Sequence, residues 1–462
     1  MVDPRVGPGQ RNVFVLGLDD FHLAQFERIR DADRYHFEPL LTPEELLRGQ
    51  TVWGHEDEPE DYSEQDHAQV PPYPFDEVVE RAIATLHAYP GSVDGITGYW
   101  DFPISDMIPI IAGRMGLHAP SLASVLKCEH KYWSRLNQQE VIPDVVPGFC
   151  MVDPFSQELT RQPPLEYPFW IKPVKSFSSY LGFRIRNHAE FESALERIRN
   201  EIHIIGDPFS DLLRRVETPG RIAELGGRAC LVEEIIGGAQ CTVEGYVADG
   251  EVHVHGVISS FRGPNRSSFH RYEYPAQLPR RVQERMINAS KKVIEHIGLN
   301  WSAFNIEYFY DRRKDRIWLV EINPRISQSH PELFDLVDGA PTTQITVQLA
   351  VGEKPTLPYR AGPYAIAAKF MLRSYEDAIV TRIPTEDDVT RVEAAFPGTR
   401  VWLEAEEGVQ LSAMPRQDSY SYELAAIYLG ARNQRELHRR YEQVLEMLDF
   451  RLEPVPAQSV NS

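Results

Sequence analysis

Long apolar runs, clustered cysteines and an excess of positive charge are all missing from this sequence. No stretch of about 18 consecutive apolar residues occurs, so we expect no membrane-spanning helix. Residues 1–5 lack the basic-then-apolar order of a secretion signal, which favours the cytoplasm. The four cysteines form no Cys-x-x-Cys pair, which argues against a zinc site or a disulfide framework. We expect most of them to be small buried apolar residues.

The negative net charge of the chain limits the classes of partner that we expect it to bind. The net charge of −20 opposes long-range attraction to nucleic acid and to anionic membranes, so we predict neither as a partner. Apolar residues make up 42% of the 462-residue chain, which is long enough for two or three domains with cores of their own. In so acidic a protein, basic residues that converge on one place indicate a local anion site, such as a nucleotide pocket.

The N-terminal part alternates strand and helix patterns. Apolar runs predict strands at 13–18 and 93–98, and helical spacing predicts helices at 21–30, 75–89 and 107–115. This order is typical of a parallel, Rossmann-like α/β unit. The turn Gly17-Leu18-Asp19 departs from the Gly-x-Gly-x-x-Gly dinucleotide fingerprint, so we do not predict NAD. The acidic stretch at 55–66 is typical of a solvated surface loop.

The middle and C-terminal parts have different patterns. Strand-rich stretches at 163–186 and 229–247 flank a helical pattern at 189–202, consistent with a small α+β subdomain that could serve as a lid. Residues 355–363 are rich in proline and glycine and form a natural linker. An amphipathic helix is predicted at 433–448. The predicted domains are 1–115, 116–358 with the lid at about 163–247, and 359–462.

Two adjacent strand patterns carry the most informative residues. Residues 301–310 and 316–323 are rich in aromatic and β-branched residues, and the charged run between them predicts a turn. A turn centred in that run places Glu307 opposite Glu321, with Asn323 on the same face. Like charges opposite each other on a ladder are destabilising, which indicates a positive ion between them. Two carboxylates and an amide suit Mg²⁺, whereas the alternative is a solvated hairpin whose glutamates face water.

The second strand of this hairpin continues into a recognisable motif. A Glu on one strand followed by Glu321-Ile322-Asn323-Pro324-Arg325 on the next resembles the metal-binding signature of the ATP-grasp superfamily, which includes carboxylate–amine ligases and biotin carboxylase. The resemblance implies a multidomain α/β and α+β fold, with a Rossmann-like N-terminal domain, an ATP-grasp central domain with a lid subdomain, and an α+β C-terminal domain. It also implies binding of ATP and Mg²⁺, or Mn²⁺ in its place, with Glu307, Glu321 and Asn323 as metal ligands.

Further motifs follow in the order of that superfamily's nucleotide site. The implied nucleotide-binding residues are Lys131, Lys172, Ser178, Ser179, Glu233, Glu234, Ile235, Ile236 and Gln240. Lys131 and Lys172 would contact phosphates. Serines replace most glycines of the family's phosphate loop at 175–182, which we expect to become ordered only with nucleotide. Residues 233–236 would hold adenine through backbone groups, and Gln240 stands where relatives have a ribose-binding Glu.

The residues after the signature bear on the reaction. In ligases of this superfamily a carboxylate attacks the γ-phosphate and an amine then displaces phosphate, which implies Arg325 and Lys369 as catalytic residues. Ser329 stands where biotin carboxylase has a glutamate base, and no Met-Lys-Met biotinylation sequence occurs. The resemblance therefore implies an amide-forming ligase that acts on an amino acid. A biotin-carboxylase-like carboxylase and a catalytically silent nucleotide-binding module are the alternatives.

Three further expectations concern partners and less specific segments. The implied partners are small-molecule carboxylate and amine substrates, and relatives are often dimers, so a homodimer is expected by analogy. Residues 418–424 resemble a helix start in the C-terminal domain of amino-acid ligases and biotin carboxylase. A basic segment either borders the substrate pocket or forms ordinary surface, and its members are Arg262, Arg266, His270 and Arg271.

Overall fold

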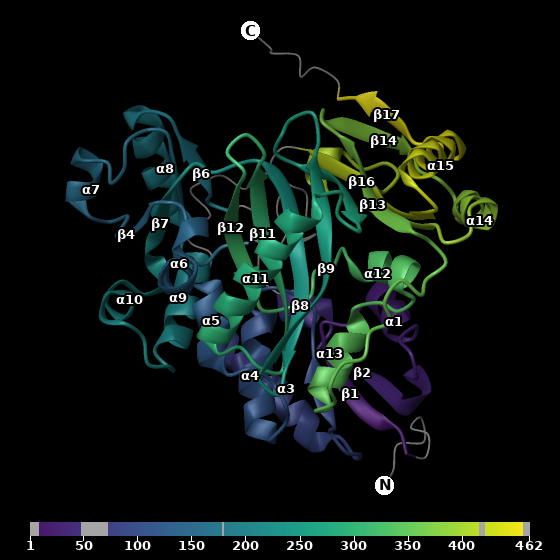
Figure 1. Cartoon of the computed structure of the whole chain (residues 1–462), viewed down its shortest axis with the longest axis horizontal. Coiled ribbons are helices and arrows are strands. Elements are labelled where there is room, and N and C mark those ends of the chain that lie inside the picture. Colours follow the sequence, from purple (N-terminus) through teal and green to yellow (C-terminus); the bar gives the residue numbers. More distant parts are fainter. Residues whose placement is uncertain (1–8, 48–72, 178–179, 415–420, 456–462) are drawn as a thin grey trace.

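This computed structural model describes residues 9–47, 73–177, 180–414 and 421–455 (Figure 1). The acidic stretch at 55–66 lies outside the described residues. The described chain forms a multidomain α/β fold with a parallel N-terminal sheet and antiparallel central sheets, which confirms the predicted fold class. Within these residues no helix is long and apolar enough to cross a membrane.

The N-terminal sheet is parallel, with the strand order β2-β1-β3. Its strands are β1 (Arg11–Leu16), β2 (Tyr35–Leu40) and β3 (Gly95–Thr97), and the helices of this region are α1 (Asp20–Phe26), α2 (Pro43–Leu47), α3 (Phe75–Ala88) and α4 (Ile104–Met115). Strand β1 is mostly apolar and buried, as expected for a strand covered on both faces. The predicted parallel α/β unit is confirmed, although α1 ends at Phe26 and not near residue 30.

A second, antiparallel sheet has the strand order β4-β7-β5-β6. Its strands are β4 (Phe149–Val152), β5 (Phe169–Pro173), β6 (Phe183–Ile185) and β7 (Cys230–Glu234). The helices before and within this region are α5 (Leu122–Glu129), α6 (Lys131–Val141), α7 (Gln157–Arg161), α8 (His188–Glu201), α9 (His203–Leu213) and α10 (Gly220–Leu225). Helix α8 confirms the pattern at 189–202. Helix α9 escaped prediction because Gly206 and Pro208 weaken its helix signal.

Eight strands form the third sheet, in the order β12-β11-β8-β9-β10-β13-β16-β15. They are β8 (Ala239–Ala248), β9 (Glu251–Arg262), β10 (Phe269–Tyr274), β11 (Ser302–Asp311), β12 (Arg316–Asn323), β13 (Ile366–Ser374), β15 (Arg400–Leu403) and β16 (Tyr422–Ala431). Helix α11 (Arg280–Ile297) packs its apolar side on one face of β8, β11 and β12. The opposite face of these strands is therefore left for polar side chains.

The eight-stranded sheet spans the proposed linker. Residues 355–363 contain no helix or strand, but β10 before them pairs with β13 after them. Helices α12 (Pro331–Asp338) and α13 (Thr343–Ala350) precede this segment. The two sides of the proposed linker therefore share one sheet. The domain limits proposed from the sequence stay a prediction.

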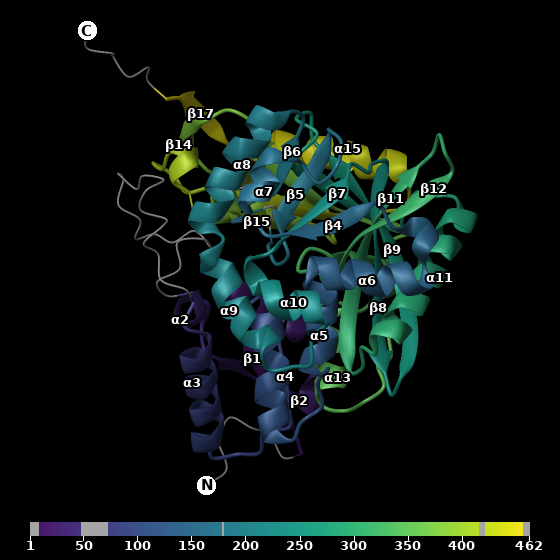
Figure 2. The ribbon, with the colours of Figure 1, turned by 90° about the vertical axis from the view of Figure 1, so that its left-hand side faces the viewer.

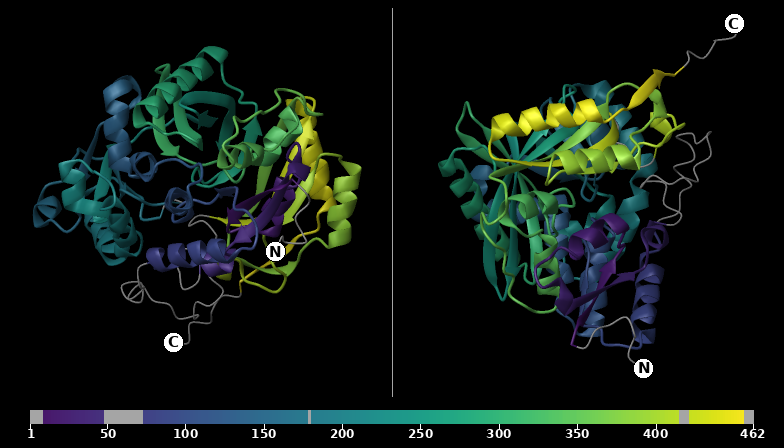
Figure 3. Two further views of the ribbon diagram at one scale, coloured as in Figure 1. Left: turned by 90° about the horizontal axis from the view of Figure 1, so that it is seen from below. Right: turned by 90° about the vertical axis from the view of Figure 1, so that its right-hand side faces the viewer.

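The C-terminal region contains one wrong prediction. Its remaining elements are β14 (Ala378–Arg382), α14 (Glu386–Ala395), α15 (Gln434–Met447) and β17 (Arg451–Pro454). Helix α15 confirms the amphipathic pattern and covers the strands of this region from outside (Figure 3). The helix start expected at 418–424 is wrong, because its described part, 421–424, leads into strand β16. Pairing with β13 and β15 on both sides outweighs the local signal there.

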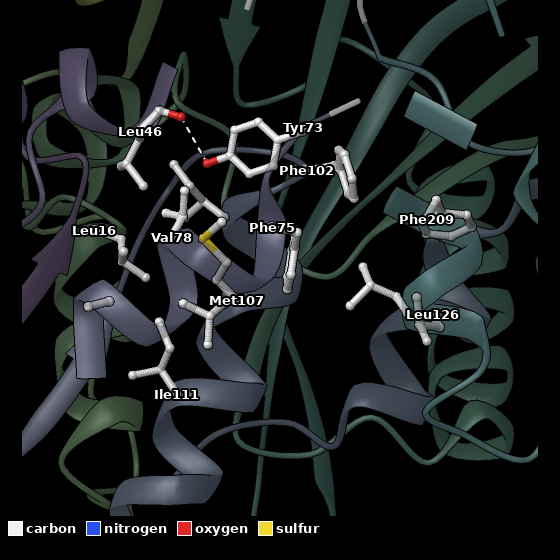
Figure 4. Packing of buried hydrophobic residues seen from close by; sticks show 14 of the residues in the cluster. Leu16, Leu46, Tyr73, Phe75, Val78, Phe102, Met107, Ile111, Leu126 and Phe209 are labelled. Carbon is white, nitrogen blue, oxygen red and sulfur yellow. Dashed lines mark hydrogen bonds between the residues drawn. The ribbon is translucent and has the colours of Figure 1, made fainter. Parts of the chain in front are cut away.

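A shared apolar cluster joins the N-terminal helices to α9. The ring of Phe102, in the loop after β3, lies 6.4 Å from that of Phe75 and 6.0 Å from that of Phe209 (Figure 4). Figure 2 shows α9 and α10 between the four-stranded sheet above and α3 and α4 below. The loop after β3 is thereby held against the middle of the molecule.

An ionic triad joins three distant segments. Glu332 of α12 is buried, and its carboxylate contacts Arg28, just after α1, and Arg400 Nε of β15 at 3.0 Å. The N-terminal, central and C-terminal regions therefore meet at one carboxylate. Because the Arg400 side chain is still 44% exposed, water screens part of this interaction.

We expect Glu332→Gln to lower the free energy of unfolding by about 1–3 kcal/mol, since it removes the charge that both arginines contact. Urea denaturation followed by circular dichroism measures this difference. The matched control is Glu295→Gln on the exposed side of α11, which should leave stability unchanged. Equal stability of the two variants would contradict the role given to Glu332.

Candidate active site

The hairpin predicted from strand periodicity is present. Strands β11 and β12 pair antiparallel, with Glu307 opposite Glu321 and Asn305 opposite Asn323. Asn323 Nδ2 donates to Asn305 Oδ1 at 3.0 Å, which leaves the Asn323 amide oxygen without a protein donor among the described residues. Gln240 Nε2 of β8 donates to Glu307 Oε2 at 2.9 Å. The predicted register is confirmed, and these five polar side chains share the face opposite α11.

The two glutamates differ in their electrostatic surroundings. Burial, and then the charge of Glu321, raise the pKa of Glu307. Burial also acts to raise the pKa of Glu321, but the nearby Lys131 and Lys172 outweigh it and lower that pKa. Lys131 Nζ lies 2.8 Å from Glu321 Oε1. Among the described residues, Glu307 has no lysine or arginine at ion-pair distance, unlike Glu321.

This donor set fits a hard divalent cation. Two facing carboxylates and a free amide oxygen are oxygen ligands of the kind that Mg²⁺ prefers. In the described part of the chain, no three His, Cys, Asp or Glu side chains cluster so as to hold a metal by themselves. An ion here would thus need further ligands such as water or phosphate, which is usual for Mg²⁺.

Two lysines converge on the same place from different elements. Lys131 begins α6, and Lys172 lies on β5. Both line one small cavity together with Glu321. Lys131 also donates to Ser176 O at 2.7 Å, so its ammonium group lies beside the start of the segment expected to cover phosphates. The two serines named for that segment, Ser178 and Ser179, lie outside the described residues.

The Glu233 side chain pairs with Lys172 and Arg135, so it is not free to contact a ligand. Lys172 Nζ lies 2.6 Å from Glu233 Oε1, and Arg135 donates to Glu233 Oε2 from Nε at 3.1 Å and from Nη2 at 2.9 Å. Burial opposes ionisation, but these two cations prevail and lower the pKa of Glu233 to about 2. Any adenine contact at the hinge would have to use backbone groups.

The rest of the predicted hinge is more open. Glu234 ends β7 with an exposed side chain that accepts from Gly148 N at 2.9 Å. Ile235 and Ile236 follow the strand and are partly exposed. Gln240 is turned toward Glu307, as described above, and accepts from Arg262 Nη2 at 2.8 Å.

Arg135 is a residue that sequence reasoning missed. Only 2% of its side chain is exposed, and it also donates to Leu319 O at 2.9 Å and to Val320 O at 3.0 Å. It therefore ties strand β7 to strand β12. The sequence did hold one signal for it: Arg135 stands four residues after Lys131, so both side chains lie on the same face of the helix.

A buried charge cluster was also missed. Lys175 Nζ lies 2.9 Å from Asp101 Oδ1 and 2.6 Å from Glu129 Oε2, and Arg325 Nη2 contacts the other oxygen of Asp101. Burial acts to raise the pKa of Asp101, but Lys175 and Arg325 outweigh it and hold that pKa well below its usual range. Burial, and then Glu129, raise the pKa of Asp106 far above its ordinary value.

The predicted catalytic lysine has a neutral partner. Lys369 Nζ of β13 donates to Ser329 Oγ at 3.1 Å and lies 5.6 Å from the centre of the Tyr428 ring. Among the described residues it has no carboxylate within ion-pair distance. Next to Ser329, the buried His330 shares a 2.6 Å contact with Glu244 Oε1.

The basic segment splits between two environments. Arg262 reaches the site through Gln240, whereas Arg271 Nε pairs with the buried Glu273 at 2.6 Å on another face of β10. Arg266 occupies an exposed turn with a positive φ of 59°. Burial, and then Arg271, lower the pKa of His270. Only Arg262 of the four is thereby joined to the hairpin glutamates.

Part of the chain matches a known domain family. The model of the ATP-grasp domain family matches residues 165–330, which include Lys172, both hairpin glutamates and Arg325. The large chain of carbamoyl phosphate synthase from Thermotoga sp. (strain RQ2) is 37% identical over 79 residues. That match covers 17% of this chain and only 7% of the synthase chain.

Solved structures share the fold over nearly the whole chain. An L-amino acid ligase from Bacillus licheniformis is 16% identical with a TM-score of 0.66, covering 96% of this chain and 99% of that one. The biotin carboxylase domain dimer of 2-oxoglutarate carboxylase from Hydrogenobacter thermophilus, solved with MgADP and bicarbonate, is 14% identical with a TM-score of 0.59. It covers 96% of this chain and 91% of that one. Residues 165–330 match the ATP-grasp domain family, and the chain has the ATP-grasp fold that these solved structures share.

The low pKa of Glu233 predicts a pH-dependent stability difference. A carboxylate whose pKa is lowered on folding stabilises the protein above its unfolded pKa, and this stabilisation disappears as the pH falls toward the folded value. The advantage of wild type over Glu233→Gln should therefore shrink by about 2 kcal/mol between pH 5 and pH 3. Urea denaturation across this range measures it. A difference independent of pH would contradict the ion pairs with Lys172 and Arg135.

Proposed function

We propose that the protein is an ATP- and Mg²⁺-dependent carboxylate–amine ligase that forms an amide bond through an acyl phosphate, with an amino acid as one substrate. Its partners would be a small-molecule carboxylate and an amine, without nucleic acid or membrane. A cytoplasmic location and a homodimer belong to the same proposal, the latter by analogy with the dimeric biotin carboxylase domain.

One observation carries the proposal, namely the convergence of opposite charges at the β11–β12 hairpin. Glu307 and Glu321 face each other across the ladder, and Lys131 from α6 lies 2.8 Å from Glu321. Lys172 from β5 lines the same small cavity. Two facing carboxylates with two lysines beside one of them suit a metal–polyphosphate ligand, in which the acids would hold the cation and the lysines the anion.

Each residue would then have a defined task. Glu307, Glu321 and Asn323 would hold Mg²⁺, which would supply positive charge to offset the charge of the phosphates. Lys131 and Lys172 would contact phosphates, and the backbone of 233–236 would hold adenine. No side-chain nucleophile is needed, because phosphoryl transfer of this kind depends mostly on positioning and on charge neutralisation.

Arg325 and Lys369 are the residues that we propose to contact the substrate. Arg325 would hold the substrate carboxylate and, after transfer, the acyl phosphate. Lys369 would assist from β13, where it carries a positive charge with no carboxylate partner among the described residues. Gln240, which replaces the expected Glu, contacts Glu307 and Arg262, so it would position the metal ligand as well as border the nucleotide.

A specific contact favours the ligase over a carboxylase. Ser329, at the place where the carboxylase base would stand, is bonded to Lys369 through its hydroxyl group. A serine hydroxyl is far too weak a base to deprotonate bicarbonate at neutral pH, whereas an amine nucleophile can use its own lone pair. The carboxylase is therefore kept as a second candidate only because several solved relatives share the fold.

We expect pools of amino acids, without bicarbonate, to stimulate release of ADP and phosphate from MgATP. Measuring ADP with and without pools, and with and without bicarbonate, separates the candidate functions. Stimulation by bicarbonate alone would contradict the ligase and favour the carboxylase. Absence of stimulation by any pool would favour a nucleotide-binding module.

We expect Glu321→Gln to reduce this turnover at least about 100-fold with little change in fold, because it removes a metal ligand and the partner of Lys131. Initial rates of ADP release measure the effect, and circular dichroism checks the fold. Glu295→Gln, an exposed change of the same kind, is the control and should retain full activity. Wild-type activity in Glu321→Gln would remove the metal-site argument.

A further inference from the structure

Asp101 joins two cations that come from other parts of the chain. It lies in the loop between β3 and α4. Its Oδ1 accepts from Lys175 Nζ at 2.9 Å, and its Oδ2 accepts from Arg325 Nη2. The three residues belong to the N-terminal region, to the segment after β5 and to the segment after β12. One carboxylate therefore connects the phosphate side of the site with its substrate side.

The loop that carries Asp101 is held rigidly. Tyr99 Oη donates to Gly17 O at 2.6 Å, and Trp100 Nε1 donates to the same carbonyl at 3.0 Å. Phe102 N donates to Asp101 Oδ1 at 2.7 Å, and the Phe102 ring lies in the cluster with α9. The carboxylate thus occupies a fixed position, which a charge that orients another group requires.

Neutralising Lys175 does not require Asp101. Glu129 lies 2.6 Å from Lys175 Nζ, and both side chains are only 4% exposed. The side chains of Asp101 and Arg325 are more open, at 23% and 20%. The Asp101–Arg325 pair therefore lies at the edge of the buried cluster, where a ligand can reach it, and Arg325 also lines a cavity between the N-terminal and central regions.

The contacts of Arg325 leave part of its guanidinium group available. Nη2 donates to Asp101, and Nη1 donates to Ile326 O at 3.1 Å. A guanidinium has five N–H donors in a planar fork, so three of them have no partner in the part of the chain that the structure describes. Two anchored donors fix the plane, and the three others form a ready receptor for a planar anion such as a carboxylate.

We propose that Asp101 is a positioning residue that orients Arg325 toward the carboxylate of the substrate. This inference rests on the proposed function and assigns to it a residue from outside the ATP-grasp domain match at 165–330. Without the Asp101 charge, Arg325 keeps a single anchor to Ile326 O and its plane can rotate. The substrate carboxylate then meets a mobile cation, and binding at a reactive geometry is lost.

The first test is kinetic and uses the full chain with MgATP and an equimolar pool of the twenty amino acids. Asp101→Asn should lower kcat/KM for the pool about 10- to 100-fold and leave the KM for ATP within about threefold. Asp101→Glu, which restores the charge, should recover part of the loss. An equal effect on both KM values, or no loss in Asp101→Asn, would overturn the positioning role.

The matched control is Asp106→Asn in the same buried cluster. Asp106 is fully buried and contacts Glu129, not Arg325, so Asp106→Asn changes the same cluster without touching the guanidinium group. This variant should retain both KM values. A loss equal to that of Asp101→Asn would show a general effect of the cluster and would overturn the inference.

The second test needs no turnover and so separates this inference from the proposed function. The Nε–H resonance of Arg325 in ¹⁵N NMR, assigned by its disappearance in Arg325→Lys, should be sharp in wild type and in Asp106→Asn. In Asp101→Asn it should broaden or move toward the position of a free arginine. If no pool stimulates ADP release, the proposed function fails while this resonance still decides the role of Asp101. An unchanged resonance in Asp101→Asn would overturn it.

Discussion

The opposition of Glu307 and Glu321 across one hairpin is the constraint on which the rest of the site depends. Bringing two carboxylates together in a partly buried place is unfavourable unless positive charge comes with them. Lys131 supplies part of that charge to Glu321, whereas Glu307 has, within the described ranges, the neutral amide of Gln240 as its partner and a raised pKa. The imbalance points to a cation that the protein itself does not provide. Metal and polyphosphate together would complete the charge balance.

Pairing of opposite charges also occurs around the hairpin. Lys172 lies against Glu233 and Arg325 against Asp101, so both of these cations pair with a carboxylate from a different segment. Long-range pairs of this kind fix the relative positions of the strands and loops that carry them. They also hold Lys172 in place, which under the proposed function would be the preorganisation that phosphoryl transfer needs.

Period-two alternation was enough to predict the hairpin register, because a shift by one residue would have turned every side chain to the other face. The parallel N-terminal unit and helix α15 followed from equally strong local patterns. Asp101 could not be predicted, since 224 residues separate it from Arg325 and only the folded chain brings them together. Strand β16 was mistaken for a helix start for a related reason: its pairing with β13 and β15 is not visible locally.

The central claim is that the hairpin holds a metal–nucleotide complex, and calorimetric titration with ADP tests it most directly. Wild-type protein should bind ADP in the presence of Mg²⁺ at least about tenfold more tightly than with EDTA. The Mg²⁺ dependence should vanish when Glu307 and Glu321 are both replaced by glutamine. Binding of equal strength with and without Mg²⁺, or no binding under either condition, would contradict the account.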